Sequence, residues 1–238
     1  MKNALIRVAL VLLLSCSAVA NLQAAPNKAI ELSADTIEYD STKGIMIAQG
    51  NIQIVQENAT MSGDYAEYNS KANETYVNGN ARIVKDDTIL VARQINSYGN
   101  TRIVANGDPI LTKGNSKLMG PSIDYDSVKQ YAIVTGWANL AMDDSIMTAN
   151  QIESFFLDNR VVAQGNVHLV SSARNLDATS EQAVYYGTQG EQGKTILTGN
   201  VRAVQEGNVL TGNTMTLYLD KKTIDVQGRS KLIIIPQS

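Results

Sequence analysis

Apolar and polar residues alternate along most of the chain, and the alternation is organised around recurring glycines. The intervals between these glycines are 29, 28, 29, 29, 34 and 29 residues. Positions two before, two after and four after each glycine are nearly all apolar, whereas positions one and three after are mostly polar. A period of two predicts β-strands with one buried and one solvated face. The marking residues are Gly50, Gly79, Gly107, Gly136, Gly165, Gly199 and Gly228.

A second strand is predicted in each repeat. A small residue recurs about 13 positions after most of the glycines, as at Gly63 and Gly120, and a second apolar column follows it. Tyrosines recur two positions later, and turn-forming runs such as 40–44 and 69–73 follow them. The 29-residue unit is therefore two strands and two turns. Stacked units of this kind are expected to form two opposed sheets around one elongated core.

The resulting expectation is an all-β fold, an elongated twisted stack of antiparallel strands built from about seven two-strand repeats. Residues 28–238 contain no linker-like segment, so they are predicted to form a single domain. Eleven aliphatic residues are expected to face the interior along its length. They are Ile37, Ile52, Ile54, Ile83, Ile95, Leu111, Ile123, Leu140, Ile152, Val167 and Leu169.

The first 25 residues resemble a secretory signal peptide. Lys2 and Arg7 precede the apolar run 8–14, and residues 18–20 offer a small-x-small cleavage site. This predicts export. Two alternatives stay open: an uncleaved anchor, although the apolar stretch is short for a membrane span, and a lipid anchor at Cys16.

The composition excludes several classes of function. The chain has one cysteine and one histidine, so a thiolate zinc site, a redox pair, a disulfide framework and a histidine metal cluster are not expected. Without Lys2 and Arg7, 18 of the 20 basic residues remain against 23 acidic ones, which disfavours nucleic-acid binding. His168 lies in an outward column, and the acidic pairs 86–87 and 143–144 are interpreted as turns. No catalytic residue, metal ligand or cofactor is predicted.

Several segments are similar to a known family. Residues 30–35 (Ile-Glu-Leu-Ser-Ala-Asp), 37–40 and 48–54 (Ala-Gln-Gly-Asn-Ile-Gln-Ile) resemble the first repeat of the LptA/OstA-like proteins, and pieces of it recur at 163–167 and 197–201. The closing run 232–236 resembles that family's last strand. These proteins are periplasmic lipopolysaccharide-transport bridges. The resemblance implies a jelly-roll or taco-like β-stack whose interior receives the acyl chains of lipopolysaccharide.

The resemblance also implies partners: lipopolysaccharide, inner-membrane and outer-membrane transport components, and like copies joined end to end. Under it, the eleven inward aliphatics are the lipid-binding residues. An exposed first strand, 30–39, and last strand, 231–235, would pair between copies. The residues assigned to that end-to-end contact are Ile30, Leu32, Leu232, Ile233, Ile234 and Ile235.

Three functional interpretations follow from these observations. The first is a periplasmic lipid carrier, either a soluble bridge or an anchored component of the same pathway; its interior, rich in alanine and poor in Phe and Trp, would leave room for a lipid chain. The second is a cell-surface β-solenoid, a spacer or adhesin with a solid core and no cargo. The third, a hydrolase of envelope polysaccharide, would need clustered carboxylates, which the polar columns do not contain.

Overall fold

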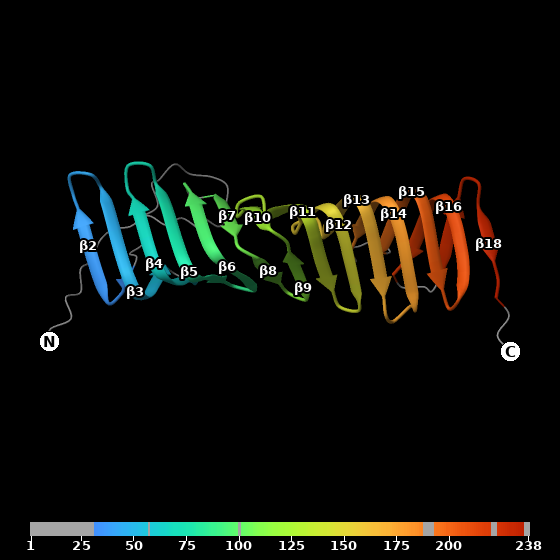
Figure 1. Ribbon diagram of the computed structural model, residues 1–238, viewed down its shortest axis with the longest axis horizontal. Helices are drawn as coiled ribbons and strands as arrows, with labels where there is room; N and C mark the ends of the chain where they lie inside the picture. Colours follow the sequence, from blue (N-terminus) through green and yellow to red (C-terminus); the bar gives the residue numbers. More distant parts are fainter. Residues whose placement is uncertain (1–30, 57, 100, 188–192, 220–222, 236–238) are drawn as a thin grey trace, which may run out of the picture. The chain divides into compact units, whose positions relative to one another are not determined.

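The computed structural model describes residues 31–56, 58–99, 101–187, 193–219 and 223–235. These residues form 18 β-strands and contain no helix, and every strand pairing between them is antiparallel (Figure 1). The predicted all-β class is therefore confirmed. The residues group into two compact units, one comprising residues up to 114 together with 122–128, the other comprising 115–121 together with residues from 129 onward. The expectation of a single domain over 28–238 stays a prediction.

In the first unit, consecutive long strands pair as hairpins, and the ends of the unit are made of shorter strands. β3 to β6 pair in sequence, β1 and β2 both pair with β3, β7 and β8 both pair with β6, and β10 pairs with β7. The strands are β1 (Glu31–Ser33), β2 (Thr36–Asp40), β3 (Ile45–Gln56), β4 (Ala59–Asn69), β5 (Glu74–Lys85), β6 (Thr88–Tyr98), β7 (Arg102–Asn106), β8 (Ile110–Lys113) and β10 (Ser122–Asp126).

The second unit repeats this plan. β9 pairs with β11, β11 to β16 pair in sequence, and β17 and β18 both pair with β16. The strands are β9 (Ser116–Met119), β11 (Tyr131–Met142), β12 (Ser145–Phe155), β13 (Arg160–Ser171), β14 (Leu176–Tyr186), β15 (Lys194–Gln205), β16 (Asn208–Tyr218), β17 (Ile224–Gln227) and β18 (Lys231–Ile233).

Five of the seven marking glycines lie in the middle of long strands, where they form β-bulges, whereas Gly107 and Gly228 lie in bends that directly follow the short strands β7 and β17. In β3, Gln49 pairs with Tyr65 and Ile52 with Gly63, so Gly50 and Asn51 oppose the single residue Asp64. The same two-against-one irregularity occurs in β5, β11, β13 and β15. Bulges of this kind bend a strand and increase its local twist. On the bulged strand β3, buried and outward positions continue to alternate across the bulge, since Ala48 before it and Ile52 and Ile54 after it are all buried.

The backbone at the bulges explains why the sequence repeats Gly-Asn there. Gly50 has φ +74° and Asn51 φ +48°, both in the left-handed region that favours Gly and Asn. The asparagine side chain then reaches the neighbouring strand: Asn51 Nδ2 donates to Asp35 Oδ2 at 2.9 Å, and Asn80 Nδ2 donates to Asp64 Oδ2 at 3.0 Å. At the fourth mark the second residue is Trp137, which does not have a positive φ and is 62% exposed.

The sequence suggested that the second small residue of a repeat precedes a strand, but in most repeats, as at Gly63 and Gly212, it lies inside a strand, beside the position that faces the bulge; Gly120 lies between β9 and β10. On β4, a Cβ at Gly63 would collide with the side chain of Val77 on β5, and Gly120 and Gly212 stand in the same relation to Val134 and Val226. The column of small residues is therefore imposed by the side chain on the next strand. Where that column carries alanine, as at Ala149, the corresponding position on the following long strand, Ala163, is also alanine.

Two details of the strand prediction are corrected. The expected first strand, 30–39, is split into β1 and β2 by a bend at Ala34–Asp35, and the expected last strand, 231–235, ends at Ile233. The bend that separates β1 from β2 lies beside the bulge of β3, since Asp35 N donates to the Gly50 carbonyl. Ile30 lies outside the described residues.

Candidate functional site

The predicted inward residues lie on the buried face of their strands in both units. Apart from Ile37, the eleven predicted lipid-contacting residues have exposed fractions of 0–6%. Ile37 lies on the edge strand β2 and is half-buried, because β2 pairs only with β3 among the described strands. The neighbouring polar positions face outward: Gln53 is exposed, and His168 Nε2 lies 3.1 Å from Asp177 Oδ1 on the outer face of β13 and β14.

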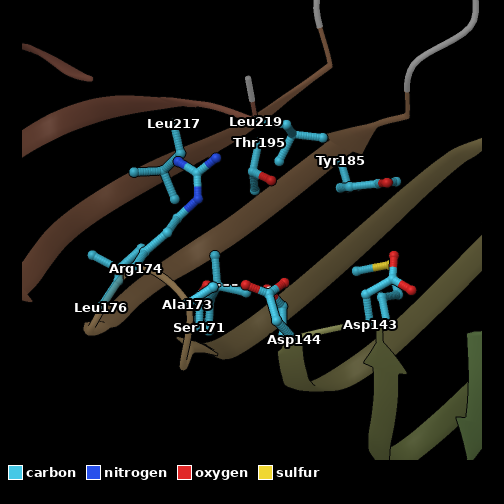
Figure 2. A pocket seen from close by; sticks show the side chains of 13 residues that line it. Asp143, Asp144, Ser171, Ala173, Arg174, Leu176, Tyr185, Thr195, Leu217 and Leu219 are labelled. Carbon is cyan, nitrogen blue, oxygen red and sulfur yellow. Dashed lines mark hydrogen bonds between the residues drawn. The ribbon is translucent and has the colours of Figure 1, made fainter. Parts of the chain in front are cut away.

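A partly open pocket of about 410 Å³ lies within the second unit (Figure 2); it is called the cavity below. One wall comes from the β11–β12 turn, the end of β13 and the β13–β14 turn; the other comes from β14, β15 and the end of β16. Its apolar lining is Met142, Leu169, Ala173, Leu176, Leu217 and Leu219, of which only Leu169 was among the predicted lipid-contacting residues.

Some polar groups of the cavity already have protein partners. Ser171 Oγ donates to Asp144 Oδ2 at 3.1 Å, and Asp143 Oδ1 accepts from Asn115 Nδ2 at 2.9 Å. Arg174, in the β13–β14 turn, donates from Nη2 to the Tyr218 carbonyl at 2.6 Å. This bond connects the two walls of the cavity, since Arg174 belongs to one and β16 to the other.

Tyr185 and Thr195 supply hydroxyl groups on the second wall. They are paired neighbours across β14 and β15, and both line the cavity. Burial, with a smaller contribution from Asp143, raises the pKa of Tyr185, so its phenol stays protonated at neutral pH. The sequence identified the tyrosine column but missed Thr195, which occupies the same inward row as Tyr185. The pairing register, which a single sequence does not reveal, brings these two residues together.

The acidic pairs considered for catalysis lie in turns. Asp86 and Asp87 form the two-residue turn between β5 and β6, and Asp143 and Asp144 form the turn between β11 and β12, as the sequence predicted. Among the described residues, no group of three or more His, Cys, Asp or Glu side chains is placed to hold a metal ion.

The C-terminal residues assigned to the end-to-end contact form an exposed apolar segment. Leu232 is 56% exposed, Ile233 44%, Ile234 68% and Ile235 55%, whereas Leu32 on β1 is half-buried. β18 pairs with β16 alone, so its second edge carries no other strand among those described. Within the part of the chain that is described, no helix is long and apolar enough to cross a membrane. The signal-peptide segment and Cys16 lie outside it.

Comparison with known proteins finds one family whose sequence pattern this chain matches. The family described as "OstA-like protein" matches residues 27–179. No curated protein sequence matches the chain. Among solved structures, LptH of Pseudomonas aeruginosa, described as the LptA-homologous periplasmic component of the lipopolysaccharide transport device, is similar at 13% identity, over 87% of this chain and 95% of that one, with a TM-score of 0.18. A score of that size carries no argument about function, and none is drawn from it.

Proposed function

Because the chain belongs to the OstA-like protein family, which its residues 27–179 match, we propose that it is a periplasmic, non-enzymatic carrier of lipopolysaccharide. The acyl chains lie against the inward aliphatic columns, and the protein bridges the inner and outer membranes. An exported chain whose strands bury one long series of aliphatic side chains is suited to shield hydrocarbon from water during such a transfer.

The observation that carries this proposal is the cavity of about 410 Å³ in the second unit. Protein interiors are normally packed to the density of organic crystals, and a space of this size lined by both apolar and polar side chains is a typical ligand volume. Leu176 and Leu217, which are each 2% exposed, would offer hydrocarbon surface to an acyl chain. Leu169 connects the cavity to the predicted lipid-contacting column.

A photo-crosslinking side chain tests lipid binding with residue-level resolution. Placed at Leu169 it should capture lipopolysaccharide in the native envelope, whereas the same group at His168, one residue away on the outer face, should not. Ile54 and Gln53 form the matched pair in the first unit. Equal labelling at the inward and outward positions, or no labelling at any of them, would contradict the carrier function.

The proposed partners follow from the same function. They are the inner-membrane and outer-membrane components of lipopolysaccharide transport, together with like copies joined end to end. The exposed segment from Leu232 to Ile235 supports the end-to-end contact, because four consecutive exposed aliphatic residues beside an unpaired strand edge are suited to β-augmentation.

A second candidate, the cargo-free β-solenoid, is favoured by one specific observation. Three repeats are closely packed beside the bulge, with glycine against valine at Gly63 and Val77, at Gly120 and Val134, and at Gly212 and Val226. Such close packing of glycine against valine is expected of a core that has no room for a ligand at that position. The crosslinking experiment separates the two, because a spacer would give no lipid adduct at Leu169.

A further inference from the structure

An inward-facing row of the second unit carries three hydroxyl groups where neighbouring rows are aliphatic. The row runs across the strands through Ser154 on β12, Val161 on β13, Tyr185 on β14 and Thr195 on β15. Ser154 is 2% exposed and Thr195 3% exposed. Figure 2 shows Tyr185 and Thr195 on the same wall of the cavity, across from Asp144 and Ser171.

These hydroxyls lack protein partners. Ser154 Oγ is fully buried and has none, and among the described residues no side chain or carbonyl forms a hydrogen bond with the hydroxyl of Tyr185 or Thr195. Leaving a fully buried hydroxyl such as that of Ser154 unpaired costs about 1–3 kcal/mol, whereas the hydroxyl-bearing side chains of Tyr185 and Thr195 line the pocket, where a ligand can reach them. Ser171, in the same cavity, is bonded to Asp144, so the chain does supply acceptors to other hydroxyls there.

The first unit has the same feature at the corresponding row. Tyr68 on β4 and Thr75 on β5 are paired neighbours, with exposed fractions of 9% and 5%. Neither hydroxyl has a hydrogen-bond partner among the described residues. Unpaired inward hydroxyls therefore occur at the same row in both units.

Building on the proposed lipid-carrier function, we infer that the hydroxyls of Tyr185 and Thr195 in this row bind the ester or amide carbonyl group at the head of an acyl chain. A carbonyl oxygen accepts hydrogen bonds and cannot donate them, and a hydroxyl in an apolar interior is the matching donor. The hydrocarbon that follows the carbonyl then lies on Leu169, Leu176 and Leu217 of the same cavity. The row thus recognises the class of acylated lipids, as opposed to hydrocarbon in general.

The charges around the cavity favour a neutral acceptor over a phosphate. Asp143 and Asp144 place two carboxylates on the lining, which would repel an anion. Arg174, the single cation of that lining, already donates to the Tyr218 carbonyl. The raised pKa of Tyr185 keeps its phenol a donor, in agreement with a carbonyl ligand.

Isosteric removal of the hydroxyls tests the inference. Thr195→Val and Tyr185→Phe leave shape and apolar area nearly unchanged, and Thr198→Val, on the exposed face of β15, is the matched control. Each inward variant should weaken lipopolysaccharide binding about fivefold, and the double variant about 20-fold, because one net hydrogen bond is lost per hydroxyl. The melting temperature of the lipid-free protein should not fall. Unchanged affinity in the double variant, as expected if water fills these sites, would overturn the inference, and so would a large loss of lipid-free stability.

A second measurement isolates the carbonyl. Binding of a diacyl phosphatidylglycerol with ester linkages is compared with that of its dialkyl analogue, which has the same chains and headgroup but ether linkages. The wild-type protein should prefer the ester lipid, and Tyr185→Phe/Thr195→Val should abolish the preference. If the wild type binds both lipids equally, only this inference fails. If it binds neither these lipids nor lipopolysaccharide, the proposed carrier function itself fails.

Discussion

Substituting alanine for Gly63 and for Val77, singly and together, should reveal how closely these two positions are packed against each other. Gly63 does not have a positive φ, so alanine there adds no backbone strain, and its cost comes from the collision with Val77. Overpacking of this kind costs about 1–3 kcal/mol. We therefore expect Gly63→Ala to lower the free energy of unfolding by about 2 kcal/mol.

The partner substitution should be destabilising alone and compensating in combination. Val77 is fully buried, so Val77→Ala removes two buried methyl groups and costs about 2 kcal/mol, including the space left behind. In the double variant the new methyl at residue 63 occupies part of that space, and the total loss should fall to about 1 kcal/mol. The expected coupling energy is therefore about 3 kcal/mol, at the upper end of values for residues in contact.

Equilibrium unfolding in urea gives the free energy of unfolding of all three variants. Gly120→Ala combined with Val77→Ala is the control, because the side chain that restricts Gly120 is Val134. The two effects should add within about 0.5 kcal/mol. Additivity between Gly63→Ala and Val77→Ala themselves would refute the packing argument, and would mean that glycine is present at this column for another reason.

Three further outcomes are expected. Ile54→Asp should cost several kcal/mol or abolish folding because it buries an unpaired charge, whereas Gln53→Asp should stay within about 0.5 kcal/mol; equal losses in thermal melts would contradict the face assignment. Burial, with Asp87 and Asp126 nearby, raises the pKa of Tyr125 to about 12. Because this tyrosine ionises at a lower pH in the unfolded chain, its contribution to the free energy of unfolding should be complete below about pH 10 and fall by up to about 2 kcal/mol towards pH 12. Tyr125→Phe should make the free energy of unfolding less dependent on pH in this range. Leu232→Lys/Ile234→Lys should leave the fold intact, since both residues are exposed, and remove concentration-dependent association in sedimentation velocity; a wild type that stays monomeric at all concentrations would rule out self-chaining.

The hydropathy columns predicted the buried face because the side-chain period of a strand is local information. Val77, Ile95 and Leu140, for example, are buried as the alternation requires. The Gly-Asn pairs were recognised as a repeat but not as bulges within strands. Gly-Asn pairs suit both the tight turns and the bulges that use a positive φ, and only the pairing of Gln49 with Tyr65 and Ile52 with Gly63 distinguishes the two.

The polar part of the candidate site could not be predicted for a different reason. Thr195 and Ser154 are two of many Ser and Thr residues in the strands, and nothing in the sequence indicates which hydroxyls lack a partner. That property depends on every atom within hydrogen-bonding distance. Arg174 is a similar case, because its bond to the Tyr218 carbonyl joins residues 44 positions apart.

The hydrogen bonds from Asn51 to Asp35 and from Asn80 to Asp64 have an evolutionary consequence. Each corner is held by contacts between a strand and its immediate neighbour, so the corner needs nothing from more distant repeats. Duplication or loss of one complete 29-residue repeat preserves every such contact in the remaining chain. Genes for proteins of this type can therefore change the number of repeats in single steps, and chain length can evolve independently of the residues that line the interior.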